Sequence, residues 1–186
     1  MKTKVLSTIT ALVFSSAMFA QTSGGPDTYG YTWKNSADVA GPAYLFNSIK
    51  GVGTQITGLG DDNSIANIPL NFNFRFYWSD YNKITVGSNG WIGFTGAPGN
   101  IAAPFPALPS TAAKNTISPL LADLTFTDNP GNPVPGTSAW YWSNNVDTFI
   151  IQYDSVPYWV TPNPGYAGRY TFQIILSGVD SSITFQ

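Results

Sequence analysis

The feature that most constrains this chain is a strict alternation of apolar and polar residues at positions 68–76. Successive side chains of a β-strand point to opposite faces, so this spacing predicts a strand with one buried face and one exposed face. Three of the buried residues are phenylalanine, a residue that β-strands favour. The expected inner positions are Leu70, Phe72, Phe74 and Phe76, and the outer ones are Asn71, Asn73 and Arg75.

Asn89 and Gly90 lie between two apolar runs, at residues 83–88 and 91–95. Asn-Gly is the preferred pair for a type I′ turn, because both central residues of that turn have positive φ. We therefore expect a tight hairpin over residues 83–95, in which Asn89 and Gly90 are structural.

Short strands separated by turn residues are predicted along the rest of the chain. Strands are expected at residues 117–126, 138–142, 148–153, 169–176 and 182–186, with weaker ones within 29–33 and 41–56, and loops at 101–110 and 128–136. No segment after residue 20 has a sustained helical period. The pattern indicates an all-β fold, an antiparallel β-sandwich of about 8–11 strands.

Residues 1–20 have the layout of a secretory signal peptide. Lys2 and Lys4 form a basic start, an uncharged apolar stretch follows, and small residues offer cleavage after Ala17 or Ala20, of which we favour Ala20. The apolar stretch is shorter than the roughly 20 residues that a membrane span needs. We expect a signal-peptide helix that is removed on export. The remaining chain would then be secreted or held at the cell surface, without a transmembrane span.

The exported part, residues 21–186, is predicted to form a single β-sandwich domain that is less regular over residues 21–67. It is long enough to bury one substantial core. Because the sequence has no cysteine, no disulfide can support that core. Alternation continues up to Gln186, so we expect the sequence to be a fragment of a longer protein.

The absence of histidine and cysteine excludes several kinds of active site. Ser-His-Asp and Cys-His nucleophilic sites cannot be built, and neither can ordinary zinc sites. With 8 basic and 10 acidic residues the chain also has no basic patch suited to nucleic acid. We therefore predict no enzymatic activity, no cofactor and no nucleic-acid partner.

Several motifs, taken in order, resemble the nidogen-like extracellular module. They are I-P-L-N-F-N-F at residues 68–74, V-G-S-N-G-W at 86–91, I-S-P-L-L-A-D-L at 117–124, Y-T-F-Q-I-I-L at 170–176 and I-T-F-Q at 183–186. The resemblance covers about residues 68–186, and it departs from the family pattern at Leu121, where a tryptophan is usual. It implies an extracellular or adhesive role. The stretch 24–33 also resembles the mature starts of exported Bacteroidota proteins, many of which carry a sorting domain for type IX secretion.

A carboxylate pair is the one catalytic arrangement that the composition leaves open, and Asp123 with Asp154 would be its members. A structural role is favoured for both. Asp123 interrupts an apolar run and must be hydrogen-bonded or paired if it is buried, so we expect it to fix a loop. Asp154 ends a predicted strand before a turn.

Two loop clusters contain the residue types of a calcium site. Asp61, Asp62 and Asn63 are weak calcium candidates, and Asp128 with Asn129 is another, but turn formation explains both and no metal is predicted. Exposed aromatic residues can bind sugars, although packing is the favoured explanation for those in this chain. The sugar-binding candidates are Trp140, Trp142, Tyr158 and Trp159. Alternation places Trp140 and Trp142 on one strand face and Tyr141 on the other.

These observations favour a non-catalytic extracellular module that acts in interaction, adhesion or structural support. The expected partner is an extracellular protein or a glycan. A carbohydrate-binding module is the alternative, and a glycoside-hydrolase-like domain with paired Asp residues is the second alternative.

Overall fold

The computed structural model describes residues 21–94, 99–107, 110–162 and 164–186. The predicted signal peptide, residues 1–20, lies outside the described residues. The chain divides into two compact units, residues 1–43 and residues 44–186. Within the described ranges no helix is long and apolar enough to cross a membrane.

The described part of the first unit contains a small antiparallel sheet of two strands, β1 (Ser23–Gly24) and β2 (Trp33–Lys34). A turn built on Asp27 joins them. The Asp27 Oδ1 accepts hydrogen bonds from the backbone N–H groups of Tyr29, Gly30 and Tyr31. An aspartate that bonds the backbone after it in this way fixes a turn without a hydrophobic core.

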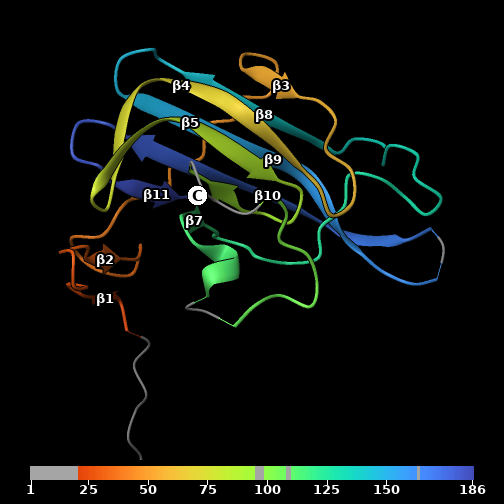
Figure 1. Ribbon diagram of the computed structural model, residues 1–186, viewed down its shortest axis with the longest axis horizontal. Helices are drawn as coiled ribbons and strands as arrows, with labels where there is room; N and C mark the ends of the chain where they lie inside the picture. The colour runs from red at the N-terminus through yellow and green to blue at the C-terminus, as the bar shows by residue number, and fades with distance from the viewer. Residues whose placement is uncertain (1–20, 95–98, 108–109, 163) are drawn as a thin grey trace, which may run out of the picture. The chain divides into compact units, whose positions relative to one another are not determined.

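The second unit consists of two antiparallel sheets (Figure 1). The five-stranded sheet has the order β11-β10-β9-β8-β3, and the four-stranded sheet has the order β4-β5-β6-β7. The strands are β3 (Thr54–Ile56), β4 (Ser64–Phe76), β5 (Ser79–Gly87), β6 (Ile92–Gly93), β7 (Thr116–Ile117), β8 (Ser138–Ser143), β9 (Thr148–Trp159), β10 (Tyr166–Ser177) and β11 (Ile183–Phe185), with one described 3-10 turn at Thr111–Ala113. The predicted β-sandwich is thereby confirmed.

The core lies between these two sheets. Leu70 and Phe74 of β4 are fully buried, as are Phe149 and Ile151 of β9. Tyr153 of β9 carries the polar link between the layers, because its buried hydroxyl lies 2.7 Å from the Gly87 carbonyl oxygen. Burial raises the pKa of this phenol, so it stays a neutral donor.

The alternation predicted for residues 68–76 is confirmed within β4. Leu70, Phe74 and Phe76 are buried, and Phe72 is half-buried. The strand is less regular than the pattern predicts, because its register with β5 shifts between Pro69 and Phe74. Asn71 lies within this shift with a φ of +67°. A left-handed residue of this kind is typical of a bulge that bends the strand.

The predicted hairpin is confirmed, but its turn type is wrong. Strands β5 and β6 pair as expected, and the Gly87 N–H bonds the Trp91 carbonyl at 2.9 Å. This closes a loop of three residues in which Gly90 has a φ of +76° and Asn89 does not have a positive φ. A two-residue type I′ turn is therefore excluded. The cause is the buried side chain of Asn89, which is committed to other segments.

The strand predicted at residues 117–126 is also wrong over most of its length. Regular pairing stops after β7, and isolated bridges join Thr125 to Asp61 and Leu124 to Tyr158. Asn89 takes the place of a neighbouring strand, since its backbone carbonyl accepts from Ala122 N and its side chain accepts from Leu124 N. The apolar character of the run reflects burial in an irregular segment.

The other predicted strands are found, and β9 and β10 extend well beyond their predicted ends. The weaker predictions within 29–33 and 41–56 are met only at their ends: β2 includes Trp33 of the first range, and β3 occupies the last three residues of the second. Residues 44–53 form a strap across the outer face of the five-stranded sheet. Ile49 N donates to the buried Gln152 Oε1 at 2.8 Å, and the buried Gln173 Nε2 donates to Asn47 O at 2.7 Å.

Candidate functional site

Asn89 is a buried junction that joins three segments at one end of the four-stranded sheet. Its Nδ2 donates to Asp62 Oδ1 at 2.8 Å and to the Ile101 carbonyl at 3.0 Å. Its Oδ1 accepts from the Leu124 backbone N–H at 2.9 Å. We predicted a structural role for Asn89. In the structure, its amide connects three loops that have no β-sheet hydrogen bonds to one another.

Gly90 supports the same junction through its backbone. The Ser118 hydroxyl donates to the Gly90 carbonyl at 3.0 Å. A Cβ atom at this position would collide with the Leu120 carbonyl oxygen, and the φ of +76° disfavours any other residue. Glycine is therefore needed here for both space and backbone conformation.

The junction brings together three carboxylates, those of Asp61, Asp62 and Asp123. Each offers one oxygen, and the three oxygens lie within 4.8 Å of one another. Asp61 and Asp62 are exposed and Asp123 is half-buried. The backbone explains the position of Asp123, because its carbonyl accepts from Trp159 N at 2.7 Å at the end of β9.

The proximity of these acids changes their protonation. Desolvation, together with the charges of Asp62 and Asp123, raises the pKa of Asp61 from 3.8 to about 6. Desolvation and the charge of Asp62 also raise the pKa of Asp123. The cluster therefore holds negative charge at a cost above about pH 6, which a proton or a hard cation would relieve.

The structure keeps only part of the predicted calcium candidate. Asp61 and Asp62 belong to the cluster, but the Asn63 Oδ1 is committed to the Gly60 backbone N–H at 2.8 Å. Asp123, predicted to fix a loop, stands in its place. Asp128 is separate: its Oδ1 accepts from Asn132 N at 2.6 Å, as expected of a turn residue.

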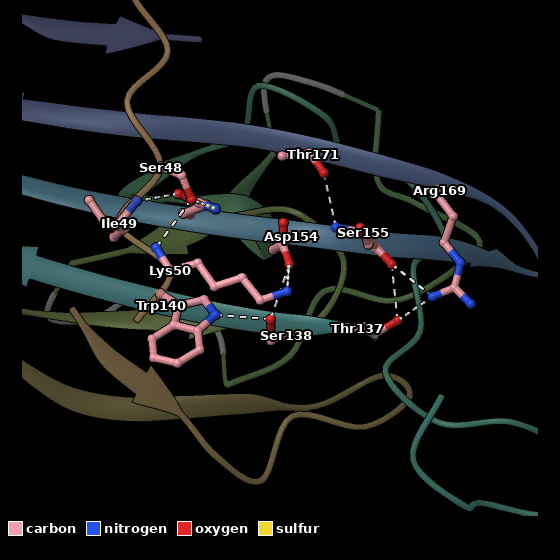
Figure 2. A network of polar contacts seen from close by, with 11 residues as sticks. Ser48, Ile49, Lys50, Thr137, Ser138, Trp140, Asp154, Ser155, Arg169 and Thr171 are labelled. Atoms are coloured by element: carbon pink, nitrogen blue, oxygen red, sulfur yellow. Dashed lines mark hydrogen bonds and ion pairs between the residues drawn. The ribbon is translucent and has the colours of Figure 1, made fainter. Parts of the chain in front are cut away.

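The two acids weighed as a catalytic pair lie in different places. Asp154 faces the outer side of the five-stranded sheet, where it forms an ion pair with Lys50 at 2.6 Å (Figure 2). The backbone carbonyl of Asp123 is bonded to Trp159 N. Trp159 is five residues after Asp154 along β9, a distance of about 16 Å between the two positions at the usual strand rise. Glycosidases need carboxylates roughly 5–10 Å apart, so this pair does not meet the requirement.

The four aromatic candidates do not form one surface. Trp140 and Trp142 share the outer face of β8, opposite Gln152 and Ile150, as the alternation predicts. The Trp140 Nε1 donates to Ser138 Oγ at 2.9 Å, so this ring is held close to the sheet (Figure 2). All four residues are half-buried.

Tyr158 and Trp159 lie at the far end of β9 from these tryptophans. Tyr158 lies six residues after Gln152, the residue paired with Trp140, which is about 20 Å along the strand at the usual rise. Its ring packs edge-on against Tyr170, with centroids 4.5 Å apart. Trp159 pairs with Tyr166 of β10. A single sugar platform made from all four aromatic residues is thus excluded by the strand layout.

A groove that the sequence does not reveal lies on the open side of the sandwich. It has a volume of about 250 Å³ and lies between β3 and β4, the edge strands of the two sheets. We call it the amide groove. Its polar and aromatic lining residues are Thr54, Asn71, Tyr141, Trp142, Ser143 and Asn145. Its parts come from two different sheets, so no local pattern in the sequence predicts it.

Comparison with known proteins gives one family. The family model described as NIDO related matches residues 38–186. No curated protein and no solved structure matches the chain. The matched range begins 30 residues before the motifs at residue 68, and it includes every strand from β3 to β11.

Proposed function

The chain belongs to the NIDO-related family, and on this basis we propose that it acts outside the cell as a non-catalytic interaction module. The single observation that carries the proposal is the extent of the match. It spans residues 38–186, so both sheets and the strap belong to the family pattern. Family membership supports an extracellular interaction role in general, and the finer statements below are proposals.

Binding by such a module depends on surfaces held in place by a rigid scaffold. The two sheets provide the scaffold, with fully buried aromatic residues such as Phe74 and Phe149 between them. Side-chain hydrogen bonds fix the irregular segments, as Asn89 and Asn144 illustrate. A separate hydrophobic cluster also holds Ile101 and Ala113 against the buried Trp91. The surface available for a partner is therefore preorganised, which lowers the entropy lost on binding.

Export through residues 1–20 is the first finer proposal. The layout of this segment supports it, and a mature chain starting at Gln21 would contain all the described residues. Adhesion at a bacterial cell surface and delivery by type IX secretion extend the same proposal. The partner would be an extracellular protein or a glycan.

A role without catalysis is supported by the residues at hand. The sequence supplies no histidine and no cysteine, and the Asp123–Asp154 pair is too widely separated for glycoside hydrolysis. The Asp61 cluster is linked to the Asn89 junction, which gives it a structural setting.

Cell fractionation of a producing strain, with N-terminal sequencing of the recovered protein, tests the export part of the proposal. We expect the protein in the medium or accessible to protease on intact cells, with a new N-terminus after Ala20. An uncleaved chain that starts at Met1 and stays inside the cell would contradict it. A chain with Gln21 changed to proline serves as the control, because proline after the cleavage site should block processing.

A further inference from the structure

The amide groove is the feature of this molecule whose chemistry is most specific. Its wall is formed by Thr54 of β3, by Tyr141 and Trp142 of β8, and by Asn71 of β4. A second hollow of about 330 Å³ adjoins it and shares Asn71 with it. Lys83 lines this second hollow. Each hollow is near the lower limit of the volumes found for small-molecule sites.

The groove has polar groups without formal charge. No lysine, arginine or aspartate is among its lining residues in the described part of the chain. The ring of Tyr141, which lies on the inner face of β8 opposite Ile151, supplies apolar surface, while hydroxyl and amide groups supply donors and acceptors. This combination suits an uncharged ligand that has both hydroxyl groups and C–H faces.

The amides at the mouth of the groove are held in fixed positions. Asn71 Nδ2 donates to Asn145 Oδ1 at 2.7 Å, so the pair bridges the two sheets. Both residues have positive φ, +67° for Asn71 and +61° for Asn145. Ser143 connects the two strands beside this amide pair, because its Oγ donates to Leu70 O at 2.8 Å and accepts from Asn145 N at 3.0 Å.

This arrangement leaves polar atoms for a ligand. Among the described residues, the Asn71 Oδ1 and the Asn145 Nδ2 have no hydrogen-bond partner. One is an acceptor and the other a donor, on two amides that are hydrogen-bonded to each other. A pair of neighbouring hydroxyl groups, each able to donate and accept, matches them.

A peptide strand is the other occupant that an open sheet edge could take, and β4 disfavours it. Strand addition needs an unbroken row of backbone donors and acceptors. Pro69 has no N–H, and the register shifts between Pro69 and Phe74. The edge therefore cannot offer a regular ladder beside the groove.

We propose that the amide groove binds a neutral oligosaccharide, with the Tyr141 ring against a sugar ring and the Asn71–Asn145 pair on vicinal hydroxyl groups. The proposal deepens the proposed function and rests on it. It relies on none of the four predicted aromatic candidates and assigns binding to residues that the sequence did not single out for it. Because the groove is open and shallow, affinity would come from several weak contacts along the chain of sugars.

The test begins with a glycan array of uncharged, sialylated and sulfated oligosaccharides, probed with the exported form of the full chain. A neutral oligosaccharide that binds is then titrated by calorimetry. Two variants probe the groove: Asn145→Gly, which keeps the left-handed backbone while removing the amide, and Tyr141→Leu, which removes the aromatic ring. Trp78→Ala is the matched control, because Trp78 is an exposed tryptophan that does not line the groove.

We expect binding of neutral glycans, a loss of affinity of about tenfold or more in both groove variants, and no change in the control. Circular dichroism and thermal melting establish that Asn145→Gly remains folded. Array silence with folded protein, binding of charged glycans only, or binding that Asn145→Gly leaves unchanged would each overturn the proposal. If Asn145→Gly still binds intact cells as the wild type does, the proposal of an interaction module is supported and the proposal that the amide groove is its binding site is refuted.

Discussion

Replacing Asn89 by alanine will destabilise the second unit, because this amide connects loops that share no β-ladder. It makes three side-chain hydrogen bonds, to Asp62, Ile101 and Leu124, and is fully buried. The substitution removes all three and adds none. The backbone N–H of Leu124, which is itself fully buried, loses its acceptor.

The expected loss can be estimated from these contacts. A typical intramolecular hydrogen bond contributes about 1 kcal/mol net, and the bond to Asp62 contributes less because that carboxylate is exposed. Leaving a buried donor unsatisfied costs a further ~1–3 kcal/mol. The free energy of unfolding should therefore fall by about 4 kcal/mol, a large part of the 5–15 kcal/mol typical of a domain.

Urea denaturation at pH 7, followed by tryptophan fluorescence, measures this loss. Asn82→Ala is the control, since Asn82 is an exposed asparagine of β5 and its replacement should change stability by less than about 0.5 kcal/mol. Asn89→Asp keeps the acceptor for Leu124 but places an oxygen against Asp62, so it too should be destabilised at pH 7. If the free energy of unfolding of Asn89→Ala is within about 1 kcal/mol of that of the wild type, the role of Asn89 in joining the loops is refuted.

Three further predictions concern the same end of the molecule. Asp61 has a pKa of about 6 when folded and 3.8 when unfolded, so wild-type stability should fall as pH rises from about 4 to about 6. Asp61→Asn should reduce that fall, leaving the part that comes from the raised pKa of Asp123, and should stabilise the protein at pH 7 by on the order of 1 kcal/mol after discounting for solvent exposure. Urea melts at several pH values measure both effects. Gly90→Ala should lower stability by more than about 2 kcal/mol in the same melts, whereas Gly99→Ala, where a Cβ meets nothing within 4 Å, should not. Replacing EGTA by calcium should leave the melting temperature unchanged. The three carboxylates fall short of the six to eight oxygens that calcium prefers, and the amide oxygens of Asn63 and Asn89 are already bonded to backbone N–H groups. A rise of several degrees in the melting temperature would contradict this prediction.

The strands of the sandwich could be predicted because period-two alternation is a local property. The buried face of β4 and the opposite faces of Trp142 and Tyr141 follow directly from it. The loop of the β5–β6 hairpin was placed correctly for the same reason. Its turn type was not, because the Asn89 side chain points inward to Leu124 instead of stabilising a left-handed turn residue.

The candidate sites depend on contacts between distant segments, which alternation does not encode. Asp123 joins Asp61 only because its carbonyl bonds Trp159 at the end of β9. The amide groove depends on a bulge at Asn71 that faces the turn after β8, where Asn145 lies. In both cases the residue types are ordinary turn residues, and their function appears only once the two sheets are packed.

The measurement that tests the central proposal most directly is saturation binding of the labelled, exported protein to intact cells that produce it. The interaction module predicts saturable and reversible binding that unlabelled protein displaces, with the bound material chemically unchanged after dissociation. Binding that rises linearly with concentration and resists displacement, or release of cleaved glycan or peptide from the cells, would contradict it.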